Sequence, residues 1–598
     1  MVTVVVVGAG PTALGVLDRL LAHAGGRPLA VHLVDPHPPG GGRVWRSAQS
    51  ALLWANSQAC DVTVLPDASV DVPGPRTTTL WDWVQRVGVT LPGGIGEQAR
   101  SMTATRFPAR TLVNGYLGWV RDELAAVPGL TLHEHRRRVV DLRTDPTGAW
   151  VVLDDGTELA ADAVVLAQGH LDALPTPAEE EVACAAAEHG LTFVPTGYTA
   201  DLDLAVLQPG EDVLVRGMGL AAVDLVTLLT GGRGGEFDRD AAGTLVYRAS
   251  GQEPVLHLGS RRGVPYRAKL GYPWAGPPVP LEFFTPHALT EVFGDRPLDL
   301  RADLAPVVAR ELGWAHYTEL FRAHPARVTV PWAEFAAAYR AGTADEELVA
   351  AAVPDPADRF DLADLDRPLA GLTCSDTQLQ SRLREHVRAD LVRAADPAHS
   401  ADSAVFATLL QCHGTVAGLL RDGRLTERSA RDDVAGWWMN LFSYLASGPP
   451  PPRLEELLAL SRAGVVHFLG AGTTVALEGG RWTARSATTG ATTRAAALVE
   501  ARIPGVDLAR TTDELLVRML GRGEVAPQAG RLRVDPRRRV VGAAGDPDER
   551  VFAVGFWTSG APVAAFARPR TNAPFFTQND GVAQEIWALA AAEAARAA

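Results

Sequence analysis

The chain has 598 residues, of which 47% are hydrophobic and 21% are charged. This length is too great for one hydrophobic core, so the composition indicates an ordinary globular protein of about two to four domains. The formal net charge of −14 argues against nucleic acid as a partner.

The cysteines and the apolar runs bear on where the protein works. Four cysteines, Cys60, Cys184, Cys374 and Cys412, lie far apart and form no C-x-x-C pair, which is typical of reduced thiols. An apolar strand begins at the second residue with no signal-peptide pattern before it, and no apolar run is typical of a membrane span. We therefore expect a cytoplasmic protein without a membrane partner, whose oligomeric state stays open.

The first 35 residues follow a nucleotide-binding pattern. The β-branched run 2–7 predicts a strand buried on both faces, and the loop Gly8-Ala9-Gly10-Pro11-Thr12-Ala13 follows it directly. An amphipathic stretch then predicts a helix up to Ala24, and a second predicted strand, 29–34, ends on Asp35. The order strand, G-x-G-x-x-A loop, helix, strand and acid predicts a dinucleotide site.

Each position in this pattern has a physical reason. Gly8 permits the tight turn, Gly10 lets the backbone approach a pyrophosphate, and Ala13 lets the helix pack on the strand. The helix N-terminus presents N–H groups and a partial positive charge to phosphates. Asp35 can accept hydrogen bonds from a ribose.

Further segments of the first half are consistent with a cofactor pocket. The Gly-rich loop 38–45 could lie against a flat ring system, although a surface turn is the alternative. The segment 52–67 is apolar with isolated amides, and Arg110 precedes a predicted helix, 112–126. Strands are predicted at 130–142 and 150–153, with a turn at 154–156. A buried strand, 163–166, ends in the small-residue loop 167–170.

A second nucleotide-type unit begins near Asp212. A predicted strand, 213–216, leads into Gly217-x-Gly219 and a helix, 222–229, and strands at 244–248 and 255–258 follow. Arg261 and Arg262 come where an acid would be expected for NAD, and their charge suits the 2′-phosphate of NADP. A surface arginine pair is the alternative.

The remainder is mostly helical from 277 to 450 and regains strand character at 465–469, 494–503 and 551–554. The sequence Asn579-Asp580-Gly581 is predicted to start a last helix. We therefore predict an α/β protein with two Rossmann-like domains, of which the first is discontinuous, and a helical insertion or lid. The predicted boundaries are 1–205 and 451–598 for the first domain, 206–276 for the second and 277–450 for the insertion.

Together these motifs resemble the two-dinucleotide-binding flavoproteins, and more closely a bacterial FAD/NAD(P)-binding family related to the lysine and ornithine N-hydroxylases. The resemblance implies that the first motif binds FAD and that the second faces a nicotinamide cofactor. The implied cofactor-binding residues are Gly8, Gly10, Pro11, Thr12, Ala13, Asp35, Gly42, Arg43, Trp45, Asn56, Arg110, Val139, Gln168, Gly169, Gly217, Gly219, Arg261, Arg262, Gly555, Asn579 and Asp580.

Two departures from that family stand out. The usual Ala-Thr-Gly strand end is Ala167-Gln168-Gly169 here, and the Baeyer–Villiger fingerprint is absent. His170 follows this loop and is a candidate catalytic residue, with a loop cap as the alternative. His133 and His135 alternate on one predicted strand, but the sequence shows no third ligand, so no metal site is expected.

Three functions remain open from the sequence. The first is an FAD-dependent, NADPH-dependent monooxygenase that acts on a small molecule such as an amine or a secondary metabolite. The second is a flavin oxidase or dehydrogenase that does not use a nicotinamide. The third is a flavin-bound scaffold without catalysis, which the intact Gly217-x-Gly219 loop disfavours.

Overall fold

The computed structural model describes residues 1–74, 76–272, 276–559 and 564–597. The chain divides into two compact units: unit 1 comprises Met1–Thr176 and Pro504–Ala598, and unit 2 comprises Pro177–Ile503. Each unit contains a parallel sheet with helices, so the predicted α/β class is confirmed.

A six-stranded sheet with the order β20-β21-β7-β1-β2-β3 forms the centre of unit 1. Its strands are β1 (Val2–Val7), β2 (Leu29–Val34), β3 (Leu130–His135), β7 (Ala163–Leu166), β20 (Arg539–Val541) and β21 (Pro547–Ala553). All neighbouring pairs are parallel except β20 with β21. Because β21 pairs with β7, a strand from the end of the chain completes a sheet begun at residue 2.

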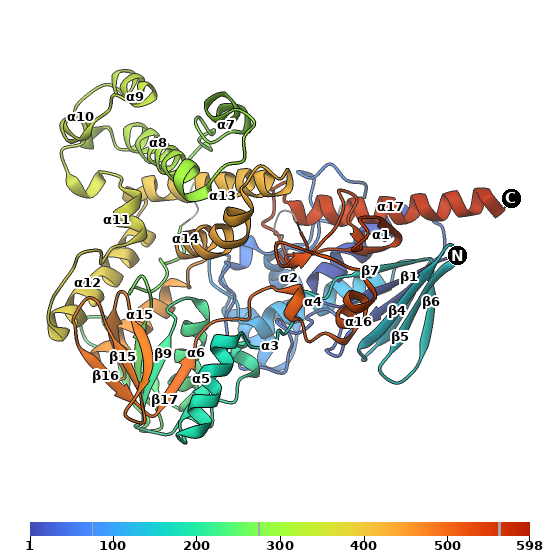
Figure 1. Ribbon diagram of the computed structural model, residues 1–598, viewed down its shortest axis with the longest axis horizontal. Helices are drawn as coiled ribbons and strands as arrows, with labels where there is room; N and C mark the ends of the chain where they lie inside the picture. Colours follow the sequence, from blue (N-terminus) through green and yellow to red (C-terminus); the bar gives the residue numbers. More distant parts are fainter. Residues whose placement is uncertain (75, 273–275, 560–563, 598) are drawn as a thin grey trace. The chain divides into compact units, whose positions relative to one another are not determined.

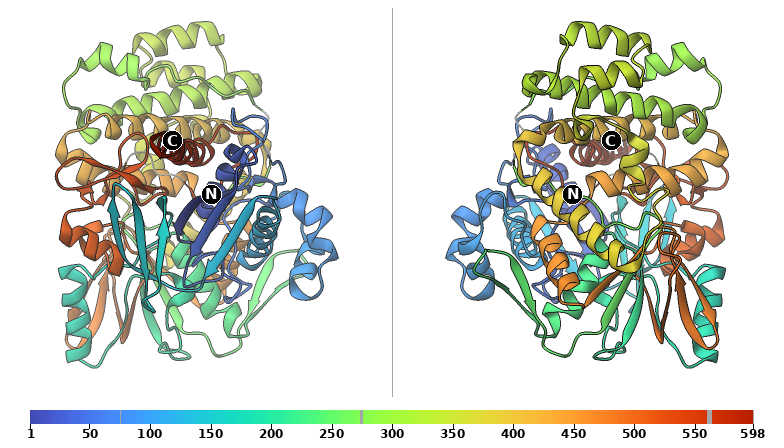
Figure 2. Two further views of the ribbon diagram at one scale, coloured as in Figure 1. Left: turned by 90° about the vertical axis from the view of Figure 1, so that its right-hand side faces the viewer. Right: turned by 90° about the vertical axis from the view of Figure 1, so that its left-hand side faces the viewer.

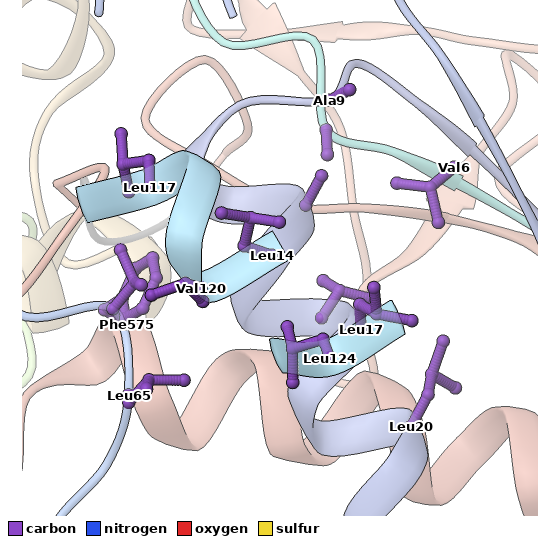
Figure 3. Packing of buried hydrophobic residues seen from close by; sticks show 14 of the residues in the cluster. Val6, Ala9, Leu14, Leu17, Leu20, Leu65, Leu117, Val120, Leu124 and Phe575 are labelled. Carbon is purple, nitrogen blue, oxygen red and sulfur yellow. The ribbon is translucent and has the colours of Figure 1, made fainter. Parts of the chain in front are cut away.

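Both faces of β1 are covered, which explains its unbroken apolar run. Val4 and Val6 pack with α1 (Pro11–Ala24), α4 (Arg110–Ala125) and α17 (Pro574–Ala597). Figure 3 shows Leu14 and Leu17 of α1 together with Val120 and Leu124 of α4 in this cluster. On the other face, Val5 and Val7 pack with α16 (Glu514–Arg522) and with the antiparallel strands β4 (Val139–Asp145), β5 (Gly148–Leu153) and β6 (Glu158–Ala161).

Unit 2 repeats this plan around a five-stranded parallel sheet with the order β13-β12-β9-β17-β8. Its strands are β8 (Thr192–Val194), β9 (Asp212–Arg216), β12 (Val255–Gly259), β13 (Val466–Gly470) and β17 (Ala497–Glu500). Val213 and Val215 face a cluster with α6 (Leu220–Leu229), α12 (Asp376–Ala395) and α15 (Pro451–Arg462). Leu214 faces α5 (Pro177–Glu188) and the antiparallel strands β14 (Thr474–Glu478), β15 (Arg481–Arg485) and β16 (Thr492–Ala495).

The predicted helical stretch between residues 277 and 450 is present in unit 2. It contains α7 (Pro286–Phe293), α8 (Ala305–Ala323), α9 (Trp332–Ala341), α10 (Glu346–Ala352), α11 (Leu362–Asp366), α12, α13 (Ser400–Arg421) and α14 (Met439–Ala446). Figures 1 and 2 show α8 and α13 side by side, and they share an apolar cluster of their own. Among the described residues, one helical stretch, Pro397–Arg421, is long and apolar enough to cross a membrane, and half of its apolar window is buried.

Several sequence expectations differ from the structure. The predicted strand 130–142 is two strands, β3 and β4, which lie in different sheets. The last helix starts at Pro574, before Asn579. β8, β13 and β17 pair with strands of unit 2, so the stretches 177–205 and 451–503 belong there and not with the first sheet. Which strands pair depends on contacts between residues far apart in the sequence, and the local sequence pattern carries no information on these contacts.

Candidate dinucleotide sites

The first glycine of each G-x-G loop has the same surroundings. Gly8 has φ +97° and Gly217 has φ +131°. A Cβ on Gly8 would lie 2.5 Å from the carbonyl oxygen of Ala167, and one on Gly217 would lie 2.6 Å from that of Ala501. Ala167 follows β7 and Ala501 follows β17, each the strand beside the motif strand. Glycine is therefore required where each loop crosses the end of the neighbouring strand.

The helices that follow these loops begin without a side-chain cap. Gly10 is the N-cap of α1 and Gly219 that of α6, and neither N-cap makes a side-chain hydrogen bond. By contrast, Thr79, Ser375 and Asp513 cap their helices with side-chain oxygens. An uncapped helix N-terminus presents unsatisfied N–H groups and a partial positive charge, which suits a pyrophosphate.

The space above Gly10 fits an approaching phosphate. A Cβ added there would meet only the Gly-rich loop, at 3.8 Å from the Cα of Gly42 and 4.0 Å from the carbonyl oxygen of Gly41. The loop is held in place because the Gly40 N–H donates to the Ala9 carbonyl at 2.7 Å. Backbone thus lines both sides of a narrow cradle, as the resemblance to flavoproteins implies for Gly10 and Gly42, and Pro11, Thr12 and Ala13 form the first turn of α1 beside it.

Asp35 is positioned beside this cradle at the end of β2. Its Oδ2 accepts the Ala9 N–H at 2.8 Å and its Oδ1 accepts the His37 N–H at 2.7 Å. Burial raises the pKa of Asp35, although these two backbone N–H groups favour the charged form. A carboxylate has further acceptor positions, so the side chain can still accept from a ribose hydroxyl.

Gln168 lies in the loop that follows β7, at the same edge of the sheet. Its Nε2 donates to Asp513 Oδ2 at 2.9 Å, and its Oε1 is buried without a hydrogen-bond partner. Asp513 also caps α16 by accepting the Leu516 N–H at 3.1 Å. A buried polar atom without a partner is rare in a finished core, so Gln168 fits a loop completed by a cofactor. Gly169, at φ +71°, continues this loop.

His170 lies in the same loop region. Its ring packs against Phe556 with centroids 4.2 Å apart. Burial, together with the Arg43 guanidinium, lowers the pKa of His170 to about 4. The imidazole is therefore neutral near pH 7 and could act there as a base or hydrogen-bond partner, not as a proton donor. Arg43 itself forms an ion pair with Asp172 at 2.9 Å.

Other predicted residues are brought to this region by backbone pairing. The Ala55 N–H donates to Pro108 at 2.9 Å and the Arg110 N–H donates to Leu53 at 2.8 Å. These bonds hold the segment with Asn56 beside the start of α4, where Arg110 stands. Trp45 packs against Phe566 with ring centroids 5.2 Å apart. Gly555, at φ +110°, lies two residues after the end of β21.

Three of the predicted residues make packing or ion contacts within unit 1. Val139 is buried in the apolar cluster between β4 and the main sheet. Asn579 faces Gly15 of α1, where an added Cβ would lie 2.5 Å from its Nδ2. Asp580 accepts from His23 at 2.8 Å and lies 3.7 Å from the Arg19 guanidinium.

Arg19 and His23, the α1 partners of Asp580, lie roughly 13–20 Å from Gly10 along the helix axis. We therefore propose that Asp580 serves the contact between α1 and α17 rather than the FAD site. The sequence pattern places Asn579 and Asp580 at a helix start near the cofactor. Their distance from the glycine loop depends on how α17 packs against α1, and the sequence pattern does not report that packing.

The two predicted phosphate-binding arginines of unit 2 differ. Arg261 is exposed, and its side chain makes no ion pair with the described residues. Arg262 donates to the Asp366 carbonyl at 2.7 Å, pairs with the Asp366 carboxylate, and lies 4.1 Å from the Tyr444 ring centroid. Both follow the end of β12, beside β9. Arg261 remains the candidate for a 2′-phosphate, and Arg262 is held in a structural contact.

The two histidines of β3 do not form a metal site with the described residues. His133 and His135 do meet a third histidine, His32, but the rings stack at 4.6 and 5.2 Å. No group of three or more His, Cys, Asp or Glu side chains arranged for a metal ion is found in the part of the chain that the structure describes. Two contact residues lie outside every sequence motif. Asp513 accepts from Gln168, and Tyr266 lies against Gly219. No sequence signal marks them, because only the fold brings them to these loops.

Two parallel sheets, each with a glycine loop at an uncapped helix, define a two-dinucleotide-binding protein. A family model described as FAD-NAD(P)-binding matches residues 5–171. An L-aspartate N-monooxygenase (nitrosuccinate-forming) of Streptomyces davaonensis is 35% identical, with 97% of this chain and 96% of the relative covered. The enzyme of the same name from Streptomyces cremeus is 36% identical over 99% of this chain and 96% of the relative.

A nitrosuccinic acid synthase of Aspergillus oryzae is 32% identical, with 97% of this chain and 92% of the relative covered. The chain therefore belongs to the family of these FAD-dependent N-monooxygenases, and it is an FAD-dependent oxidoreductase. Among solved structures, an ornithine hydroxylase from Pseudomonas aeruginosa matches 98% of this chain and 100% of its own, at 12% identity and a TM-score of 0.43.

Proposed function

We propose that the protein uses NADPH and oxygen to oxidise the amino group of L-aspartate, toward nitrosuccinate. The observation that carries this proposal is the 35–36% identity to two L-aspartate N-monooxygenases over almost the whole of both chains. Because the similarity spans both units, it includes the second glycine loop as well as the first. The proposed setting is the cytoplasm, where NADPH is available.

The proposed reaction has a simple balance. Bound FAD would supply the redox and oxygen chemistry, taking two electrons from NADPH. One oxygen atom of O₂ is transferred to the amine nitrogen, and the other leaves as water. A nitro group requires repeated oxidation of the same nitrogen. The chain's part is to hold the pyrophosphate at α1, the ribose at Asp35 and the cofactor rings away from water.

The substrate is tested with the purified FAD-loaded enzyme. We expect L-aspartate to stimulate NADPH oxidation and to yield an N-oxygenated product detected by mass spectrometry. L-Asparagine, L-glutamate and L-ornithine are the matched controls, since they alter the side-chain charge or length. Product from ornithine and none from aspartate would overturn the proposed substrate. NADPH oxidation that yields only hydrogen peroxide with every amine would overturn N-oxygenation.

The preference for NADPH is tested at the two arginines. Arg261→Ala should raise the KM for NADPH and leave that for NADH nearly unchanged, because only NADPH carries the 2′-phosphate that a guanidinium can bind. Losing such a contact typically costs about 1.5–3 kcal/mol, or roughly 10- to 150-fold in affinity. Arg262→Ala should mainly lower stability, since Arg262 is bound to Asp366.

Stopped-flow flavin reduction with both nucleotides is the measurement. An equal loss for NADH and NADPH in Arg261→Ala would show that Arg261 does not read the phosphate. If neither nucleotide reduces the wild-type flavin, even with aspartate present, the oxidase or scaffold function replaces the proposal.

A further inference from the structure

The second glycines of the two loops differ in what lies against them. A Cβ on Gly10 would meet its nearest neighbour, the Gly42 Cα, at 3.8 Å. A Cβ on Gly219 would meet the ring of Tyr266, with Cζ at 2.9 Å, Cε2 at 3.1 Å and the hydroxyl oxygen at 3.2 Å. The first cradle is therefore open at this point, whereas a phenol covers the second.

The covered position is the one that a dinucleotide needs. In this loop type the second residue is glycine so that the backbone can approach the pyrophosphate. The phenol end of Tyr266 stands over that backbone, at the uncapped N-terminus of α6. Two groups cannot occupy the same volume, so the Tyr266 ring and a pyrophosphate placed over Gly219 exclude each other.

The backbone around Tyr266 is held firmly. Its own N–H donates to the Met218 carbonyl at 3.2 Å, and the Arg267 N–H donates to Tyr444 at 3.1 Å. The next residues are tied to α12, because Arg267 Nε and the Ala268 N–H both donate to the Asp390 carboxylate, at 2.7 and 2.6 Å. A shift of this segment as a whole would break these bonds.

The side chain is held less firmly than the backbone. Its ring is partly exposed and meets Tyr444 edge-on, with centroids 6.3 Å apart. Among the described residues, no hydrogen bond of the Tyr266 hydroxyl is found. Rotation of the side chain about its own bonds therefore uncovers Gly219 without moving the chain.

We propose that Tyr266 is a gate on the nicotinamide dinucleotide site, whose phenol covers the pyrophosphate position and swings away when NADP(H) binds. This inference rests on the proposed use of NADPH by the second glycine loop. Because only open molecules bind, the apparent affinity equals the affinity of the open state multiplied by the fraction of molecules that are open. A gate closed about nine-tenths of the time lowers the affinity about tenfold.

The test measures binding to the FAD-loaded, oxidised enzyme by titration calorimetry with NADP⁺ and with adenosine 2′-phosphate. The second probe carries the 2′-phosphate but no pyrophosphate. Tyr266→Ala should bind NADP⁺ about tenfold more tightly than wild type and bind adenosine 2′-phosphate unchanged. Tyr266→Phe keeps the ring and should behave as wild type. FAD content and thermal unfolding verify that each variant is folded, and Tyr266→Leu serves if Tyr266→Ala is not.

The outcomes separate the gate from the proposed function. If NADP⁺ binds wild type and the Ala or Leu variant equally, or the variant more weakly, the gate is overturned while NADPH use stands. If NADP⁺ binds neither, both are overturned. Arg261→Ala should weaken both probes in every background, which identifies the 2′-phosphate contact independently of Tyr266.

Discussion

At the residue scale, the two glycines of one loop meet different requirements. Gly8 and Gly217 are needed by the protein itself, because a Cβ would strike the backbone of the neighbouring strand end. Gly10 is not crowded by the protein, since its nearest neighbour to a Cβ is 3.8 Å away. We therefore propose that the requirement for glycine at position 10 comes from the ligand.

This difference predicts that a substitution at Gly10 leaves the protein folded but removes its cofactor. Gly10→Val should leave the free energy of unfolding of the FAD-free protein within about 1 kcal/mol of wild type but abolish FAD binding, because the side chain fills the cradle. Absorbance of the purified protein and reconstitution with FAD measure this. Gly118→Ala on α4, where nothing lies within 4 Å, is the control and should be yellow. Retention of FAD by Gly10→Val would contradict the assigned cradle.

The histidine stack predicts acid sensitivity. Burial, together with His133 and His135, lowers the pKa of His32 from 6.5 to about 4. The folded state thus resists protonation that the unfolded state accepts, so the stability contributed by neutral His32 is complete above pH 6.5 and is lost as the pH falls toward 4.

Between pH 7 and pH 4.5 we expect a loss of about 1–2 kcal/mol from this partly solvent-exposed residue, measured by urea unfolding at both pH values. His32→Phe should show a smaller loss than wild type. His287→Gln, at a side chain that is 85% exposed, is the control and should show the wild-type loss. The same pH dependence in His32→Phe and wild type would exclude His32 as the cause.

At the scale of elements, α1 links the two ends of the chain. Its N-terminus forms one side of the proposed FAD cradle, while its C-terminal half packs against α17. Asp580 of α17 binds His23 and approaches Arg19, and Gln584 donates to its other oxygen at 2.7 Å. One helix therefore carries both the cofactor contact and the closure of the discontinuous unit.

Removing this contact separates the two roles. Asp580→Ala should lower the free energy of unfolding by about 2–4 kcal/mol, because the buried carboxylate that contacts His23, Arg19 and Gln584 is lost. The Kd for FAD should change less than about twofold, since no cofactor contact is lost. Thermal unfolding and FAD titration measure the two effects. A large loss of FAD affinity in a stable variant would return Asp580 to the cofactor site.

At the scale of the whole molecule, the two units share one architecture. Each places a parallel sheet between helices and a three-stranded antiparallel sheet, and each has its glycine loop after a central strand. Unit 2 alone carries the additional helices between residues 277 and 450, which have their own apolar clusters. We expect these helices to act as the lid that a flavin monooxygenase needs to exclude water.

The lid hypothesis predicts a response to ligands. Addition of NADP⁺ and L-aspartate to the FAD enzyme should slow amide hydrogen exchange within residues 277–450, because closure reduces local opening. Mass spectrometry of peptides measures the exchange, and peptides of β4 and β5 serve as the internal control. Unchanged exchange throughout 277–450 at saturating ligand would exclude a lid and favour a separate role for these helices.

The local units of this protein could be predicted from its sequence: β1 with its loop and α1, Asp35 directly after β2, and the second loop between β9 and α6. These follow from apolar runs, glycine spacing and helix propensity, which act between residues close in the chain. Other features became visible only in the folded chain. There β17 joins the second sheet, Asp366 binds Arg262, Asp580 packs on α1 and Tyr266 covers Gly219. Each of these features depends on which distant segments pack together. That packing is set by the burial of the whole core, and a local sequence pattern does not specify it.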